Sequence, residues 1–298
     1  MHTIKTNLVK GDYVHLIFIN KEVEYVFCNY ESFDNNNKFS EIFETTDGGK
    51  MWHSVKKNSY LIASNVTPYY YNGELYFGLE ANNNFFITSL KSKKYLGKSK
   101  SLYSIFNLGN KIYYSNSLGI TNIETGKLMN GISIGNDLST NGNNLITIKS
   151  DKTTDYLIKY SIDDNFKMNQ VKSNLHSFKI AKQIQGSNLI FAGQDNLGKI
   201  NISKLDIRND NIVALYSTNK YSIVENLQTD KSIISCFLGN IVGGIVKYDI
   251  LYSLDYGNTW NIKSFNSLIS IHPNFRISNN IYILTENSQF SILDLKDK

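Results

Sequence analysis

Short runs of apolar and aromatic residues alternate with polar residues along the whole chain, and Asn, Gly and Asp separate these runs at short intervals. Two typical runs are residues 39–44 and 246–252, which are rich in β-branched and aromatic side chains. Runs of this kind, bounded by turn residues, predict β-strands, and no stretch shows the spacing of an amphipathic helix. Many short strands with turns between them predict a sandwich, a barrel or a propeller.

One eight-residue pattern, Ser/Thr-x-Asp-x-Gly-x-x-Trp, occurs at residues 45–52 and 253–260 and includes both tryptophans of the chain. The Asp carboxylate can accept backbone N–H groups of a turn, the Gly tolerates a positive φ, and the Ser/Thr hydroxyl adds a second local hydrogen bond. The Trp is expected to pack beneath the turn, where its indole N–H needs a partner. We therefore predict a structural role for the residues that define the pattern: Thr45, Asp47, Gly49, Trp52, Ser253, Asp255, Gly257 and Trp260.

This pattern resembles the Asp box, the repeat of sialidase-like and other β-propellers. The resemblance implies an all-β chain that forms a β-propeller. It also implies that the boxes lie on the outer rim, away from the face that binds ligands.

The repeat can be followed along the chain by two kinds of marker. Full, degenerate and weak equivalents of the box place its third position at Asp47, Lys91, Glu124, Asp163, Asp206, Asp255 and Asp294. A turn followed by a strand recurs at residues 11–14, 73–76, 109–112, 143–146, 186–189, 239–242 and 279–282. Seven units in 298 residues give about 43 residues each, the length of a four-stranded blade. We expect seven blades, with a six-bladed ring as the alternative.

The last unit ends after its predicted third strand, residues 289–293. The N-terminal segment, residues 3–8, can supply the missing outer strand, which would close the ring and remove a free sheet edge. No linker or change of composition divides the chain, so we expect a single propeller domain over residues 1–298.

Charge and composition narrow the classes of function. The formal net charge of +5 is too small to indicate nucleic-acid binding, and no segment resembles a signal peptide or a membrane span. We therefore expect a cytoplasmic protein without a nucleic-acid or membrane partner. Cys28 and Cys236 lie far apart in apolar runs, which predicts two buried free thiols.

The resemblance also raises the question of sialidase activity. Enzymes of that family hold the substrate carboxylate with three arginines, whose planar forks pair with it bidentately. This chain has only Arg208 and Arg276, beside 29 lysines, so the triad cannot be built. The fragment 275–278 is similar to the Phe-Arg-Ile-Pro segment of the family, but it has Ser in place of Pro and follows the last box.

Other catalytic patterns point to no enzyme. Residues 131–135 match Gly-x-Ser-x-Gly, but the nucleophile elbow needs a following helix and the next stretch is rich in Asn and Gly. The five histidines have no ligand spacing, so we expect no metal and no cofactor. We assign no catalytic residue.

Two segments and one arginine are candidates for binding a partner. Residues 91–100 contain five lysines, which suit either an acidic partner or an exposed outer strand protected by charge: Lys91, Lys93, Lys94, Lys98 and Lys100. Three adjacent tyrosines beside a turn suit either an interface or ordinary core: Tyr69, Tyr70 and Tyr71. Arg276 is the third candidate.

A propeller is a rigid platform for loops, and these observations favour a non-catalytic protein that binds another protein. Assembly factors and the immunity proteins with which bacteria neutralise toxins belong to this class. The alternatives are a carbohydrate-binding propeller lectin and a glycoside hydrolase of the sialidase-like superfamily. A lectin would repeat one aromatic pocket in every blade, whereas a hydrolase needs acids and an arginine clustered on one face.

Overall fold

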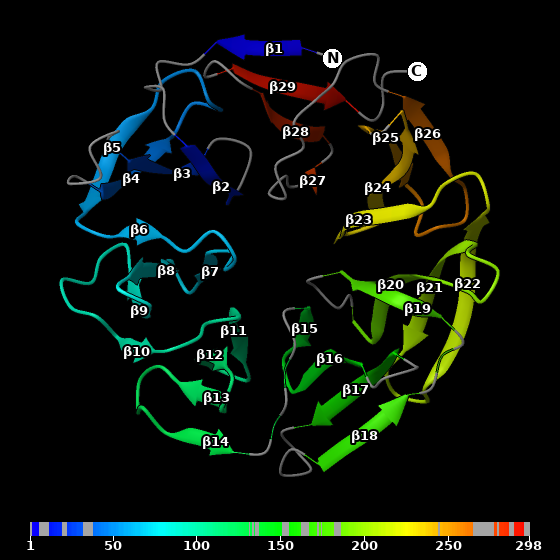
Figure 1. Ribbon diagram of the computed structural model, residues 1–298, viewed down its shortest axis with the longest axis horizontal. Helices are drawn as coiled ribbons and strands as arrows, with labels where there is room; N and C mark the ends of the chain where they lie inside the picture. The colour runs from blue at the N-terminus through cyan, green and yellow to red at the C-terminus, as the bar shows by residue number, and fades with distance from the viewer. Residues whose placement is uncertain are drawn as a thin grey trace. The chain divides into compact units, whose positions relative to one another are not determined.

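The computed structural model of the 298-residue chain consists of β-strands and turns, without a helix in the residues it describes. The described residues are 2–5, 12–19, 23–31, 38–130, 132, 134, 137–150, 155–161, 167–171, 173, 175–181, 186–243, 245–264, 277–278, 280–285 and 289–294. Their strands form seven antiparallel sheets, of which six have four strands and one has five (Figure 1). The all-β prediction is therefore confirmed.

The chain divides into two compact units, and the first comprises residues 1–106, 111–131 and 270–298. It contains four of the sheets. The first is β2 (Asp12–Phe18), β3 (Glu24–Glu31), β4 (Lys38–Thr45) and β5 (His53–Asn58). The second is β6 (Leu61–Ile62), β8 (Glu74–Ala81), β9 (Asn84–Ser89) and β10 (Gly97–Ser99), with β7 (Tyr69–Tyr71) also paired to β8. The third is β11 (Ser104–Leu108), β12 (Lys111–Asn116), β13 (Gly119–Asn122) and β14 (Leu128–Asn130).

The fourth sheet of this unit joins the two ends of the chain. Its strands are β27 (Ile277–Ser278), β28 (Asn280–Thr285), β29 (Gln289–Asp294) and β1 (His2–Lys5). The register pairs Thr3 with Ser291 and Ile4 with Phe290, so the N-terminal segment does supply the fourth strand. The rest of the segment predicted for this strand, residues 6–8, lies outside the described residues.

The second unit comprises residues 107–110 and 132–269 and contains three sheets. The first is β15 (Leu138–Asn141), β16 (Asn144–Ser150), β17 (Asp155–Ser161) and β18 (Lys167–Val171). The next is β19 (His176–Ile180), β20 (Asn188–Gln194), β21 (Ile200–Asp206) and β22 (Asn211–Thr218). The last is β23 (Ile223–Asp230), β24 (Ile233–Val242), β25 (Ile245–Ser253) and β26 (Asn261–Ser264).

The core of each unit lies between the faces of successive sheets. In the first unit, Tyr25, Phe27 and Ile42 pack against Ile62 and Phe77 of the next sheet, and Phe27 and Phe77 are fully buried. In the second unit, one cluster of buried residues joins β20 and β21 to β24 and β25. Cys28 and Cys236 are both buried, and neither belongs to a disulfide in the described part of the chain, as the sequence predicts. Burial of these apolar faces holds the sheets that share a cluster against one another.

The box equivalents mark the same place in each sheet. In the strand order of each sheet, six of the seven equivalents lie at the end of the third strand or just after it. The first is Asp47 after β4, and the last is Asp294 at the end of β29. The seventh, Asp163, follows β17 in the sequence but lies outside the described residues.

The turn-and-strand markers are less regular. Five of the seven markers lead into the second strand of a sheet, whereas residues 11–14 lead into β2, the first strand of its sheet. The marker at 239–242 is wrong, because these residues lie inside β24. The turn before β24 contains Lys231, whose φ is 51°.

Candidate functional site

The first box closes the turn between β4 and β5 as its chemistry predicts. The Asp47 Oδ1 atom accepts the Thr45 hydroxyl at 2.8 Å and two backbone N–H groups of the turn at 3.0 Å each. These hydrogen bonds, foremost that from the backbone N–H of Met51, lower the pKa of Asp47. Gly49 has a φ of 89°, and its carbonyl accepts the indole N–H of Trp52 at 3.0 Å.

The second box repeats this geometry between β25 and β26. The Ser253 hydroxyl donates to Asp255 Oδ1 at 2.8 Å, and the Thr259 backbone N–H donates to the same oxygen at 2.8 Å. Gly257 has a φ of 87°, and its carbonyl accepts the Trp260 indole N–H at 2.9 Å. The carboxylates of both boxes are therefore engaged within their own turns.

A buried carboxyl lies beneath the first box. Glu24 begins β3, pairs with Thr45, and is only 3% exposed. Its Oε1 atom has no hydrogen-bond partner among the described residues, and its Oε2 atom lies 3.7 Å from the place where a side chain on Gly49 would begin. Burial, with a smaller contribution from the charge of Asp47, raises the pKa of Glu24 to about 8. This group therefore changes charge near neutral pH, inside the fold.

The lysine segment forms the loop before β10 and the outer edge of its sheet. The loop is held in place by Lys56 of β5, whose Nζ donates to the carbonyls of Ser89 at 2.6 Å and Ser92 at 2.9 Å. Within the loop, the Ser92 hydroxyl donates to the carbonyl of Lys94 at 2.8 Å. Lys91 Nζ lies 3.8 Å from a carboxylate oxygen of Glu74. The segment is thus an outer strand and an ordered loop, one of the two forms expected for it.

Three aromatic rings stack beside these lysines. The ring centroids of Tyr60 and Phe86 are 5.3 Å apart with an angle of 20° between the planes, and those of Phe86 and Tyr95 are 4.9 Å apart. The Lys98 Nζ atom lies 5.5 Å from the centre of the Phe86 ring. Tyr95 is 53% exposed, so the stack presents an open aromatic surface. Burial, and to a smaller extent the neighbouring Tyr60, raises the pKa of Tyr95.

The other sequence candidates lie elsewhere. Tyr69, Tyr70 and Tyr71 form β7, which pairs with β8. Tyr69 and Tyr71 pack against the core, whereas Tyr70 is 42% exposed, and a role of the segment in an interface stays a prediction. Two strands, β8 and β9, separate this segment from β10, so the tyrosines and the lysines do not form one surface. Arg276 lies outside the described residues.

A second exposed surface, which the sequence reasoning missed, lies at the hairpin of β24 and β25. In this hairpin, β24 and β25 continue past the ends of their neighbours β23 and β26. The overhang consists of three residue pairs, from Asn240 with Lys247 to Val242 with Ile245. Ile241 is 65% exposed and Val242 is 52% exposed. We call residues 240–243 and 245–247 the ribbon end. The apolar run on both sides of Gly243 in the sequence was the available signal.

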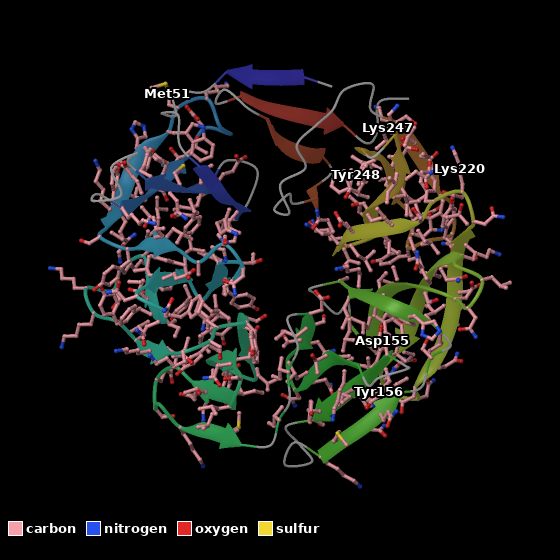
Figure 2. All side chains as sticks on the ribbon, in the orientation of Figure 1. Met51, Asp155, Tyr156, Lys220, Lys247 and Tyr248 are labelled. Atoms are coloured by element: carbon pink, nitrogen blue, oxygen red, sulfur yellow. The ribbon has the colours of Figure 1, made fainter. Side chains whose placement is uncertain are left out.

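The ribbon end is connected to the neighbouring sheet of the same unit. Asn240 donates a side-chain hydrogen bond to the carbonyl of Lys220, and Gln194 at the end of β20 donates one to the carbonyl of Ser222, each at 2.6 Å. The turn that follows Gln194 carries Leu197, which is 92% exposed. Figure 2 labels Lys220, Lys247 and Tyr248 around this sheet. The apolar tips of two hairpins are therefore linked through residues 220–222.

Tyr248 anchors the base of the ribbon end. A side chain on Gly239 would begin 2.9 Å from the Tyr248 ring, so the ring lies directly against the glycine backbone. The Tyr248 hydroxyl donates to Glu225 of β23 at 2.9 Å. The ribbon is thereby fixed to the four-stranded part of its sheet.

No group of three or more His, Cys, Asp and Glu side chains in the described part of the chain is placed to hold a metal ion. None of the described segments forms a helix long and apolar enough to cross a membrane.

Comparison with known proteins identifies the fold. No protein-family model and no curated protein matches the sequence. An uncharacterized protein from Listeria monocytogenes is similar in structure, with a TM-score of 0.62 at 10% identity over 93% of this chain and 90% of that one. The β-propeller domain of the Trilobed protease from Pyrococcus furiosus has a TM-score of 0.60 at 11% identity over 97% and 96% of the two chains.

A third similar structure is an acylaminoacyl peptidase from Pyrococcus horikoshii, with a TM-score of 0.62 at 10% identity. It covers 93% of this chain, which spans about half, 49%, of that one. At these identities the likeness concerns the fold alone. The chain has the fold of β-propeller proteins, and no family model supports the sialidase-like superfamily that the box resembles.

Proposed function

We propose that this protein is a non-catalytic β-propeller that binds another protein, as an assembly factor or as a neutralising partner of the immunity type. The observation that carries this proposal is the ribbon end. Ile241 and Val242 are successive residues of β24 and project from opposite faces of the hairpin tip, where a partner that encloses the tip can bury both.

The ribbon end combines exposure with a fixed position. Burying one aliphatic side chain fully is worth about 1.5–3 kcal/mol, so Ile241 and Val242 together can contribute a large share of a binding energy. The Tyr248 hydroxyl and the close contact with Gly239 hold the base of the ribbon in one arrangement. Less conformational entropy is then lost when a partner covers the tip. A partner with an apolar pocket is the complement of this surface.

Affinity capture from the lysate of the native host tests the function. We expect the wild-type protein to retain one dominant partner protein in stoichiometric amount, identified by mass spectrometry. The double variant Ile241→Ser/Val242→Ser should retain at least about tenfold less of it, because the apolar contact is lost. The matched control is Val213→Ser/Ile262→Ser, which changes two apolar residues that are 43% and 42% exposed on the strands β22 and β26.

Two results would argue against the proposal. One is that the wild-type protein retains only background. The other is that the ribbon variant and its control retain the partner equally. Turnover of a glycoside by the purified protein would favour the hydrolase alternative instead.

We also propose that the seven sheets are the blades of one closed ring and that the ring is a single domain. The pairing of β1 with β29 supports closure, since it completes a sheet built from both ends of the chain. Hydrogen exchange tests it: the amides of residues 2–5 that bond to β29 should be protected in the native protein, whereas those that face away from β29 exchange faster. Rapid exchange of the bonded amides in the native protein would show that the N-terminal strand does not hold the ring closed.

A further inference from the structure

The three stacked rings and the lysines beside them form a surface on the sheet of β6 to β10. We call it the rim surface and define it by Tyr60, Phe86, Tyr95, Lys93, Lys94 and Lys98. The ribbon end belongs to the other unit of the chain.

Strand register explains why these residues meet. Cross-strand pairing aligns Ile62 with Leu79, Leu79 with Phe86 and Phe86 with Lys98, so all four side chains project from one face of the sheet. The row runs from buried Ile62 and Leu79 to half-buried Phe86 and exposed Lys98. The stack is completed by two flanking residues, Tyr60 directly before β6 and Tyr95 from the loop before β10. The apolar core thus continues into an aromatic surface that ends in a cation.

The loop that carries Lys93 and Lys94 is ordered before any partner binds. Lys56 Nζ donates to three carbonyls where the loop begins, and the Leu96 backbone N–H donates to the Ile87 carbonyl at 2.7 Å. The Thr88 hydroxyl donates to the carbonyl of Lys94 at 3.3 Å. A loop fixed in this way loses little conformational entropy on binding.

The charge of the segment is one-sided. Residues 91–100 contain five lysines and no acidic residue. Lys91 lies near Glu74, whereas Lys93, Lys94, Lys98 and Lys100 form no ion pair within the described part of the chain. All four are exposed. The potential of this surface is therefore positive and is not neutralised by the protein itself.

We propose that the rim surface binds an acidic segment of a partner protein, with carboxylates on the lysines and one apolar or aromatic side chain on the exposed face of Tyr95. This inference rests on the proposed function in one respect: it takes from it that the ligand is a protein. It adds the surface and the chemistry of the bound segment.

The geometry favours a protein segment over a nucleic acid. Proteins that bind single strands offer several separate aromatic faces to successive bases. Here the three rings contact one another as one group, and Tyr95 is its exposed member. One apolar side chain flanked by carboxylates matches one aromatic face flanked by lysines.

A short labelled peptide that carries glutamates on both sides of one tryptophan tests the inference by fluorescence anisotropy. We expect the full-length protein to bind it at low salt, and to lose the binding near 1 M salt, where the Debye length is about 3 Å. The variant Lys93→Gln/Lys94→Gln/Lys98→Gln should bind about tenfold more weakly. Tyr95→Ser should weaken binding several-fold at unchanged charge.

The matched control is Lys111→Gln/Lys127→Gln/Lys231→Gln, which removes three exposed lysines outside the rim surface. It should change the affinity by less than about twofold. Unchanged melting curves of the variants show that they are folded. An equal loss in the control, no binding by the wild-type protein, or tighter binding of an oligonucleotide or an acidic polysaccharide of equal charge would overturn the inference.

The outcome can be separated from that of the proposed function. If lysate capture retains a partner but the peptide does not bind the rim surface, the protein-binding function stands and this inference fails. If the peptide binds the rim surface while capture retains only background, the recognition chemistry stands and the proposed function loses its support.

Discussion

The variant Trp52→Ala should lose about 3–5 kcal/mol of the free energy of unfolding, the cost of deleting a buried aromatic side chain. Trp52 is 3% exposed and lies beneath the first box turn. Its removal leaves a cavity and also leaves the Gly49 carbonyl without the indole N–H that it accepts at 3.0 Å. Chemical denaturation monitored by far-ultraviolet circular dichroism measures the loss.

Trp260→Ala provides the matched comparison in the second box. Trp260 is half-buried, packs on Tyr216 with ring centroids 5.3 Å apart, and makes the same kind of hydrogen bond to Gly257. Because less surface is buried, its loss should be smaller, about 1–3 kcal/mol. If both variants unfold like the wild-type protein, the structural role of the boxes is wrong.

The second large effect is expected from Glu24→Gln, which should make the protein more stable at alkaline pH. The pKa of Glu24 is raised from 4.5 to about 8, so the folded state keeps a proton that the unfolded state has lost between these values. The free energy of unfolding of the wild-type protein therefore falls as pH rises through this window. The variant should exceed the wild-type protein by about 3–5 kcal/mol near pH 8 and by almost nothing at about pH 4.

Chemical denaturation across this pH range gives the free energy of unfolding of both proteins. The contributions of all other titratable groups cancel when one value is subtracted from the other. Glu80→Gln is the matched control, because Glu80 is an exposed glutamate of β8. Because this side chain is exposed, its substitution should change the free energy of unfolding by less than about 0.5 kcal/mol. A pH-independent difference between Glu24→Gln and the wild-type protein would contradict the account of Glu24 as a buried, partly unpaired carboxyl.

The sequence predicted the strands and the third-strand turns because their chemistry is local. Asp47 and Asp255 bind backbone groups within a few residues, so the pattern alone specifies the turn. The marker at 239–242 failed for a physical reason: Gly239 serves the close approach of Tyr248 across the strands, and not a turn. Glycine inside a strand often marks such an approach.

The candidate surfaces were predicted only in part. The lysines were visible as a charged run, but Tyr60 and Phe86 join them only through the register of β9 with β10 and the packing of the segment before β6. The tyrosine strand β7 and the lysine strand β10 were both candidates, and only the strand order shows that β8 and β9 lie between them. The burial of Glu24 has no local signal, since it depends on the turn that folds over it.

Calorimetric titration of the captured partner, purified, into the wild-type protein and into Ile241→Ser/Val242→Ser tests the central claim most directly. The account predicts stoichiometric binding to the wild-type protein and an affinity at least about tenfold lower for the variant. Equal affinity of the two proteins would show that the ribbon end is not the binding surface, and no heat of binding to the wild-type protein would contradict the interaction itself.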